Sequence, residues 1–282
     1  MPAHADPYRA IDSQPDPEQF VAFLEERGNT LSQMRLRRRF LRFCGIRPGW
    51  HVLEIGSGTG VLTRDVAAMV GARGRVTGVD PSRVLVGAAR RLACERGLDG
   101  RVDFRVGNGT RLGFPANRFE CALAVTVLLH VPDGGAIVRE LVRVTKPGGV
   151  VGVQDQDLGA LVLHHPDRVL TRQILDGVAA RTIVDPWSGR ALVGRLVEAG
   201  LTRVRLTTDV FQDTTYTPFT RSMLERRADN AVRFGITSAR SAARWRKTLE
   251  RLAETRRFVM TLNFYGAAGV KPARRPATEE AT

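Results

Sequence analysis

At residues 52–60 the chain reads Val52-Leu53-Glu54-Ile55-Gly56-Ser57-Gly58-Thr59-Gly60, and this stretch decides the fold. A short apolar run ends in three glycines at every second position, and residues 61–70 follow with apolar side chains at helical spacing. A strand, a tight glycine turn and a helix form the unit with which an α/β sheet binds a nucleotide-like ligand. Glycine lets a ligand approach the backbone closely, and the start of the helix offers free N–H groups.

Two familiar nucleotide loops do not fit this stretch. The dinucleotide loop needs a third glycine where the chain has Val61, and a phosphate loop needs a Gly-Lys-Ser/Thr ending, which is absent. The pattern E-x-G-x-G-x-G instead resembles motif I of the class I S-adenosylmethionine (SAM)-dependent methyltransferases. The resemblance implies that SAM binds here, and a carboxylate is a natural acceptor for its ammonium group. The residues expected to contact it in this loop are Glu54, Gly56, Ser57, Gly58 and Gly60.

A second apolar strand, residues 75–80, ends in Asp80, which lies 20 residues beyond Gly60. An acid at the end of the second strand of such a sheet accepts hydrogen bonds from the ribose hydroxyls of a bound nucleoside. The alternative is that Asp80 only caps a turn formed with Pro81 and Ser82. Because the spacing from the glycine loop is correct, we favour the ribose role for Asp80, with Pro81 beside it.

The stretch Gly107–Pro115 resembles the G-D-A-x-x-L-P-F segment of the same family, which lies against the adenine. This chain has Asn108 where the family usually has aspartate. An asparagine oxygen still accepts a hydrogen bond from the adenine amino group, although its NH₂ adds a donor. The backbone N–H groups of Gly109 and Thr110 are expected to meet the ring nitrogens.

A buried strand over residues 119–126 leads into Val127–Asp133, which resembles the family segment that passes under the methionyl part of SAM. Thr126 is therefore added to the predicted cofactor residues. The first of the two frequent histidines is Leu129 here, which leaves His130. We treat His130 as a candidate catalytic residue, with helix capping or packing as an equally open role. The run Leu141–Gly149, ending Lys-Pro-Gly-Gly, is a further family mark that a sharp helix-to-strand turn explains fully.

Polar residues alternate directly after the fifth predicted strand, in Gln154-Asp155-Gln156-Asp157. Residues at this end of a strand line the ligand crevice of an α/β sheet, and alternation places either the glutamines or the aspartates toward it. Asp155 is the predicted general base or substrate anchor, and a solvated loop position is the alternative.

Composition excludes several other classes. The net charge is +14, but it comes from 40 arginines and 3 lysines that are scattered apart from Arg35–Arg39. This usage is typical of a GC-rich genome, so we do not expect a nucleic-acid partner. No apolar run approaches a membrane span, and no signal-peptide pattern is present. The three cysteines lack metal-ligand spacing, so no metal is expected, and buried free thiols fit a cytoplasmic location.

The fold class expected is α/β: a Rossmann-like seven-stranded sheet with an antiparallel last strand, helices on both faces and helical lid insertions. The expected segments are a leader and N-terminal helix (1–29), a SAM-binding core (30–157), lid helices with strand six (158–256), a final strand (257–272) and a disordered tail (273–282). The first 18 residues are expected to be loose. The run from Trp187 to Leu201 resembles the UbiE-like small-molecule subgroup.

The predicted function is methyl transfer from SAM to O, N or C of a small molecule, such as a secondary metabolite. Aromatic residues of the second half predict an apolar acceptor pocket; they are Trp187, Phe211, Tyr216, Phe219 and Trp245. Two alternatives stay open: an RNA or protein methyltransferase, and a SAM-binding enzyme that transfers no methyl group. A homodimer is also left open.

Overall fold

The computed structural model describes residues 6–273, and within them the strands form one sheet of eight. The helices are α1 (Glu18–Asn29), α2 (Leu31–Cys44), α3 (Val61–Val70), α4 (Arg83–Cys94), α5 (Gly134–Val144), α6 (Arg168–Thr182), α7 (Ser188–Glu198), α8 (Pro218–Arg233) and α9 (Ala239–Glu254). The strands are β1 (His51–Ile55), β2 (Arg75–Asp80), β3 (Val102–Val106), β4 (Phe119–Val125), β5 (Thr145–Gln156), β6 (Val162–Leu163), β7 (Thr202–Asp213) and β8 (Met260–Val270).

The sheet follows the order β3-β2-β1-β4-β5-β8, with β6 and β7 both paired to β8. Strands β1 to β5 are parallel, and β8 runs antiparallel to β5, β6 and β7. The predicted antiparallel last strand is therefore confirmed. The sheet has eight strands where seven were expected. The additional strand is the two-residue β6, which pairs with β8 beyond the point where β5 ends.

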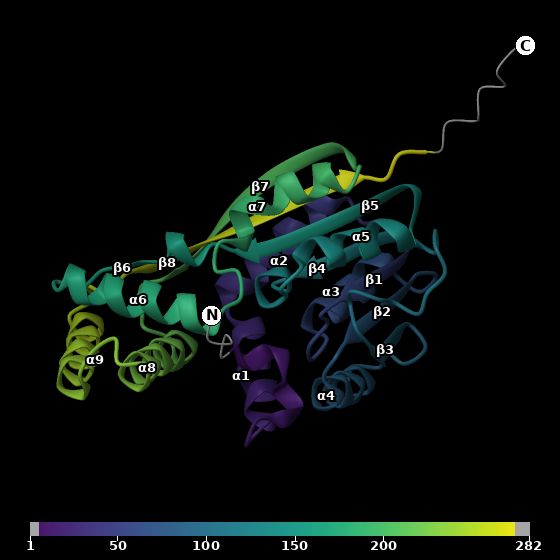
Figure 1. Cartoon of the computed structure of the whole chain (residues 1–282). Helices are drawn as coiled ribbons and strands as arrows, with labels where there is room; N and C mark the ends of the chain where they lie inside the picture. Colours follow the sequence, from purple (N-terminus) through teal and green to yellow (C-terminus); the bar gives the residue numbers. More distant parts are fainter. Residues whose placement is uncertain (1–5, 274–282) are drawn as a thin grey trace, which may run out of the picture.

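Helices cover both faces of this sheet, as expected (Figure 1). On one face α2, α3 and α4 pack against alternate strand residues such as Val52, and on the other α5 and α7 pack against their neighbours, such as Leu53. Both side chains are fully buried. Strand alternation therefore creates two cores from one apolar run.

A third core lies outside the parallel strands. Strands β7 and β8 extend past the sheet and carry α6, α8 and α9 at one end of the molecule (Figure 1). Trp245 of α9 is the largest fully buried side chain of this cluster, and its ring N–H donates to Thr171 Oγ1 of α6 at 3.0 Å. The lid helices are thus a packed unit.

The expectation of a loose leader is wrong for residues 6–18. Two 3₁₀ turns, Pro7–Arg9 and Ile11–Ser13, precede α1, and Asp6 and Ile11 are buried. Asp12 accepts hydrogen bonds from the first residues of α4, including Arg83 N at 2.8 Å. Residues 1–5 and the tail from 274 lie outside the described residues, so the predicted disorder there stays a prediction.

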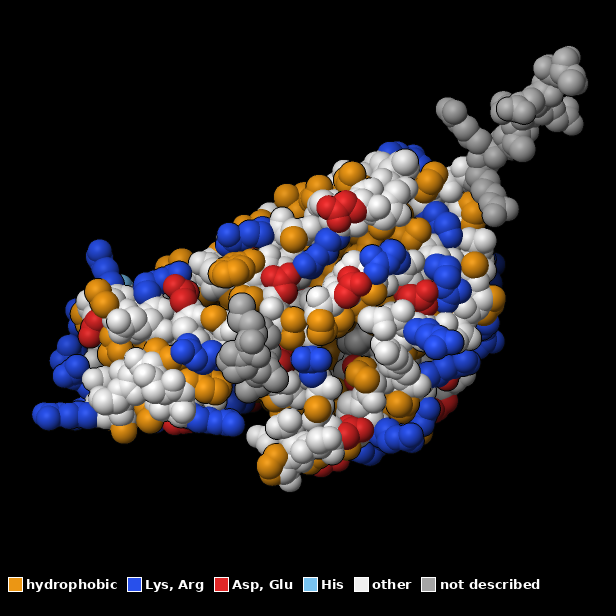
Figure 2. All heavy atoms as spheres, viewed as in Figure 1, with side chains coloured by type: hydrophobic (Ala, Val, Ile, Leu, Met, Phe, Trp, Pro, Cys, Tyr) orange, Lys and Arg blue, Asp and Glu red, His pale blue; other side chains and the backbone are white. Residues whose placement is uncertain are grey.

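Two features of the surface and of the helices bear on partners. Figure 2 shows lysine and arginine side chains spread over the visible face among acidic and apolar ones, with no single basic patch. None of the helices within residues 6–273 combines the length and the hydropathy of a transmembrane span. Cys44 and Cys121 are buried as expected, whereas Cys94 is exposed.

Candidate functional site

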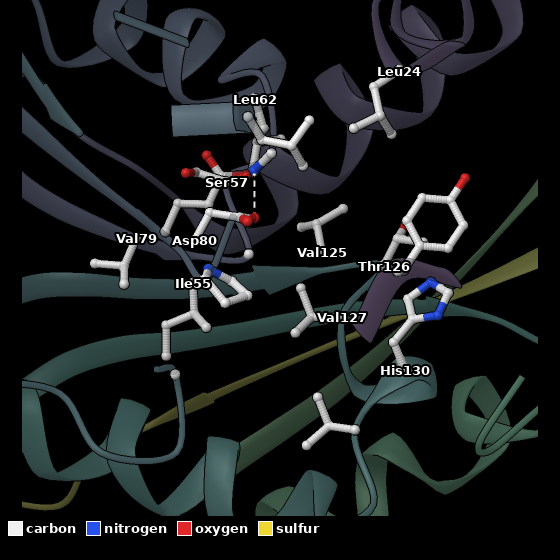
Figure 3. Close-up of a pocket in the computed structure, with 18 of the residues that line it drawn as sticks. Leu24, Ile55, Ser57, Leu62, Val79, Asp80, Val125, Thr126, Val127 and His130 are labelled. Atoms are coloured by element: carbon white, nitrogen blue, oxygen red, sulfur yellow. Dashed lines mark hydrogen bonds between the residues drawn. The ribbon is translucent and has the colours of Figure 1, made fainter. Parts of the chain in front are cut away.

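The first of two cavities lies where the carboxyl ends of β1, β2 and β4 meet α1 and α2. Its volume is about 490 Å³, and all the predicted cofactor residues except Gly60 line it. Figure 3 shows Ser57 and Asp80 on one side of this cavity and Thr126 and His130 on the other. The predicted residues, up to 72 positions apart in the sequence, therefore line one common cavity.

The glycine loop has backbone angles that only glycine adopts easily. Gly56 and Gly60 have φ of 69° and 79°, and a Cβ on either would lie 2.3 Å from Val127 and 2.5 Å from Phe104, respectively. A Cβ on Gly58, with φ of 52°, would approach only Leu24, at 3.4 Å. Gly58 therefore leaves its side of the loop open to a ligand, while the outer glycines serve packing.

Glu54 lies at the base of this cavity and is only 3% exposed. Thr63 of α3 donates its hydroxyl to Glu54 Oε2. Burial, together with the charge of nearby Asp80, raises the pKa of the Glu54 carboxyl to about 8, and the Thr63 hydrogen bond, Arg37 and Arg64 oppose the rise. The charges of Arg37 and Arg64 do not offset the effect of burial, and a ligand ammonium would add a further cation.

Asp80 both shapes the loop and faces the cavity. Its two oxygens accept from Gly58 N and Ser82 N, each at 2.9 Å. The capping alternative is therefore real, but it does not displace the side chain from the cavity lining that Asp80 shares with Pro81. Burial raises the pKa of Asp80, and these two backbone hydrogen bonds act against that rise.

The segment expected at the adenine departs from the prediction in detail. Asn108 Oδ1 accepts from both the backbone N and the hydroxyl of Thr110, each at 2.9 Å. That oxygen must release one of these bonds before it can accept from an adenine amino group, and Thr110 N is engaged in the same way. Gly109 is buried and lines the cavity close to Ile55, where a Cβ would lie 2.4 Å away.

Three polar atoms of the lining have no hydrogen-bond partner among the described residues. They are Ser57 Oγ, Thr59 Oγ1 and Gln154 Nε2, and all three are buried. Buried polar groups without partners are costly and are normally satisfied by a ligand or by water. A nucleoside with an amino-acid tail offers donors and acceptors along its whole length, so these residues fit SAM.

A second cavity, of about 660 Å³, adjoins the first and reaches the lid helices. Residues common to both linings mark where the cavities meet; they are Tyr8, Arg27, Gln33, Thr126, His130 and Phe264. Of the aromatic residues predicted for an acceptor pocket, Phe211 and Phe219 line the second cavity. Trp187 is exposed instead, and Tyr216 and Trp245 are buried within the lid core.

His130 lies at this junction with a fixed orientation. Its Nδ1 is 2.8 Å from Asp6 Oδ2, and its ring packs 4.7 Å from that of Tyr8. The side chain of Asp6 is fully buried. In a neutral imidazole the nitrogen that faces a carboxylate carries the proton, so Nδ1 donates to Asp6 and Nε2 is the acceptor in that form. Sequence analysis missed Asp6 and Tyr8, since 124 residues separate Asp6 from His130 and no local pattern connects them.

The position expected for Asp155 is wrong. Its side chain is 0% exposed and lines neither cavity. It accepts from Val127 N at 3.0 Å, from Leu129 N at 3.1 Å and from Ser188 Oγ at 2.7 Å. Burial raises the pKa of Asp155 to about 6, and the Ser188 hydrogen bond opposes that rise. Asp155 thus holds the loop that carries His130, from behind.

The glutamines of the same strand occupy the positions expected for the aspartates. Gln154 lines the first cavity and Gln156 the second. Asp157, like Asp155, points toward α7, where Arg190 binds it through two hydrogen bonds of 2.6 and 2.9 Å. The alternation was visible in the sequence, but the two aspartates face α7 because that helix supplies their donors.

Gln33, which the sequence offers as a candidate for the ligand carboxylate together with the arginines of its helix, lines both cavities, and Arg27 is a further residue that a motif search does not find. Arg27 donates to Thr126 Oγ1 at 3.1 Å and has no carboxylate partner among the described residues. Burial lowers the pKa of Arg27. Of the arginines on α2, only Arg37 reaches the first cavity, and it already binds Asp65 and Gly28 O. Arg27 is therefore the cation best placed for a ligand carboxylate.

Comparisons with known proteins match the part of the chain that contains the glycine loop. A family model described as a methyltransferase domain matches residues 52–149. The chain is 35% identical over 116 residues to the ubiquinone/menaquinone biosynthesis C-methyltransferase UbiE of Pseudomonas aeruginosa, covering 41% of this chain and 45% of that protein. It is 29% identical over 231 residues to an uncharacterized 37.1 kDa protein in transposon TN4556 of Streptomyces fradiae, covering 80% and 65%.

Solved structures share the fold. A phosphoethanolamine N-methyltransferase of Haemonchus contortus in complex with SAM has a TM-score of 0.59 and 18% identity, covering 94% of this chain and 60% of that one. The [4+2]-cyclase SpnF has a TM-score of 0.51 and 24% identity, covering 87% and 85%.

Residues 52–149 therefore match a methyltransferase domain, and the chain has the fold of the solved methyltransferase structures. The chain spans less than two thirds of the length of the two curated relatives described above.

Proposed function

We propose that this protein transfers a methyl group from SAM to a small molecule bound in the second cavity. The observation that carries the proposal is the meeting of the two cavities at Thr126 and His130. One cavity has the cofactor loop of the family, and the other is lined by the lid helices with apolar side chains and arginines. A cavity of this size suits a small acceptor better than RNA or protein.

In this proposal the residues of the first cavity hold SAM along its length. Asp80 and Pro81 take the ribose, Gly109 and the Asn108–Thr110 turn face the adenine, and Glu54 balances the ammonium. The loop from Gly56 to Gly60, with Ser57 and Gly58, lies against the middle of the cofactor, and Thr126 lies beside the methionyl part. Arg27 and Gln33, on α1 and α2, cover the carboxylate. The unpartnered Ser57 Oγ and Gln154 Nε2 support this placement.

Bound SAM supplies an electrophilic methyl group, so the protein's task is to align the acceptor and accept a proton. His130 Nε2 is free to accept that proton because Asp6 holds the other ring nitrogen. Asp155 fixes the backbone of the loop after β4 and thereby the position of His130. Tyr8 and the lid helices exclude water from the junction of the two cavities.

A general base suits an acceptor that loses a proton on methylation, such as a hydroxyl, an amine or an acidic carbon. The atom that is methylated is left open among these. We further propose a cytoplasmic location, supported by the reduced, buried thiols of Cys44 and Cys121.

The proposal is tested by following a labelled methyl group. Incubate the protein with SAM labelled on the methyl group together with a cell extract separated into small-molecule, RNA and protein fractions. We expect the label in the small-molecule fraction, and less of it with His130→Ala. Label confined to the RNA or protein fraction would contradict the small-molecule acceptor. Binding of SAM without transfer in any fraction would favour an enzyme that keeps the cofactor without using its methyl group.

A further inference from the structure

The second cavity is lined by two kinds of side chain. Apolar residues come mostly from the ends of β7 and β8 and from α8, and include Phe211, Phe219, Met223, Met260, Leu262 and Phe264. Four guanidinium groups also line it, from Arg27 of α1 and from Arg226, Arg227 and Arg233 of α8. A cavity that serves only an apolar molecule has no need of these cations.

The described carboxylates that line the cavity do not form ion pairs with these four arginines. Two line it, Asp6 and Asp229. Asp6 is bound to His130, and Asp229 accepts from Arg246 of α9. No ion pair joins any of the four lining arginines to a carboxylate within residues 6–273. With four arginines and two carboxylates, the lining carries more positive than negative charge.

Arg227 is half-buried, and its Nε is buried without a hydrogen-bond partner among the described residues. The carboxylate of Asp176 acts on it, although Asp176 is itself paired with Arg172 at 2.9 Å. Burial lowers the pKa of Arg227 to about 10, which still leaves the side chain charged at neutral pH. A buried donor without a partner is costly, and a ligand anion in the cavity would satisfy it.

Its neighbour Arg226 is held in place by other means. The guanidinium lies 4.0 Å from the centre of the Phe23 ring and donates to Ser222 Oγ at 3.1 Å. Neither contact neutralises its charge, and the carboxylate of Glu26, which acts on it, lies outside the cavity lining. A planar guanidinium fixed in this way is preorganised to bind a carboxylate or a phosphate through two parallel hydrogen bonds.

We propose that the acceptor is an amphipathic anion, with an apolar body and a carboxylate or phosphate group that binds Arg226 and Arg227. The inference rests on the proposed function and narrows its substrate. The apolar body packs against Phe211, Phe219 and Met260. Arg226 and Arg227 come from α8 and His130 from the loop after β4, so the anionic group and the atom to be methylated bind to side chains of different elements.

The preference of the cavity for an anion is tested first on the wild-type protein, with three ligands that have the same ten-carbon chain and different head groups. Decanoate, 1-decanol and decylammonium are titrated by calorimetry into the protein saturated with S-adenosylhomocysteine. Decanoate is expected to bind about tenfold more tightly than decanol, because its carboxylate accepts charge-assisted hydrogen bonds that a hydroxyl does not. Decylammonium is expected to bind most weakly.

Variants then show which arginines cause the preference for decanoate. Arg227→Gln and Arg226→Gln are each expected to remove most of the advantage of decanoate over decanol. The matched control is Arg240→Gln, which removes the same charge from the exposed start of α9 and should leave the advantage unchanged. Binding of S-adenosylhomocysteine shows whether each variant is folded.

The inference is overturned if decanoate binds wild type no more tightly than decanol, whether both bind or neither does. It is also overturned if the advantage survives in whichever of the two cavity variants folds. A wild-type protein that does not bind S-adenosylhomocysteine would instead overturn the proposed function, and the inference with it.

Discussion

At the scale of single residues, the pairing of His130 with Asp6 bears on the proposed reaction rather than on cofactor binding. The pair lies at the junction of the two cavities, and Asp6 contacts neither the glycine loop nor Asp80 through any hydrogen bond described. We therefore propose that the pair acts in the reaction of the acceptor. A variant of either residue should therefore affect turnover and leave the binding of SAM largely intact.

We expect His130→Ala to lower kcat by about 10²-fold or more, the usual contribution of a positioned general base. Asp6→Asn should lower kcat less, because the ring remains in place while its tautomer is no longer fixed. The measurements are kcat with the acceptor found in the labelling experiment and calorimetric binding of SAM. Equal kcat in wild type and His130→Ala would remove the histidine from the mechanism.

Glu54 gives a pH dependence of stability. Its pKa in the folded, ligand-free protein is about 8, above the ordinary value of 4.5, so the folded protein retains a proton that the unfolded chain has released. The free energy of unfolding should therefore fall as the pH rises from about 4.5 to about 8, by about 1.4 kcal/mol for each unit of difference between the two pKa values.

The variant Glu54→Gln has no such proton, so its stability should fall less over the same range. The check is urea unfolding of both proteins at pH 5 and pH 8. The comparison between them isolates Glu54 from other groups such as Asp155, whose raised pKa acts in the same direction. An identical fall in both proteins would show that Glu54 is not protonated in the folded state.

At the scale of elements, the leader and α4 act together. Asp12 accepts from Ser82 Oγ and from Arg83 N, at the positively charged start of α4. This contact holds the 3₁₀ turns over the first cavity, which Tyr8, Arg9 and Ile11 help to line.

We expect Asp12→Ala to weaken SAM binding several-fold and to lower the free energy of unfolding by about 1 kcal/mol, the typical contribution of a helix-capping side chain. Asp16→Ala is the matched control, because Asp16 is exposed and bonds only to Gln19 next to it. Calorimetry and urea unfolding measure the two effects. A loss of the same size in both variants would mean that the leader does not act through α4.

How far the sequence predicts the site depends on the range of the interactions. The glycine loop and Asp80 follow from local patterns, because β1, β2 and the turns between them are close in sequence. The side on which Asp155 lies could not be predicted, since it depends on Ser188 of α7, 33 residues away. The leader was missed for the same reason: composition describes a segment's intrinsic order but not the surface to which it binds.

At the scale of the whole molecule, the fold was predicted more fully than the site. Periodicity predicted the long strands and helices, and the resemblance supplied their order. The short β6 has too few residues to give a pattern. The relation between the two cavities could not be read from the chain, because it arises where α1, β4, β8 and the lid converge. That convergence is what makes the molecule suited to bring a cofactor and an acceptor together.

The central claim, that SAM binds at the glycine loop with its ribose on Asp80, is tested most directly by calorimetric titration with SAM. We predict saturable binding to the wild-type protein, and an affinity at least about tenfold lower for Asp80→Ala, because charge-assisted hydrogen bonds to the ribose are lost. A wild-type protein that does not bind SAM, or an Asp80→Ala variant that binds it with unchanged affinity, would contradict the account.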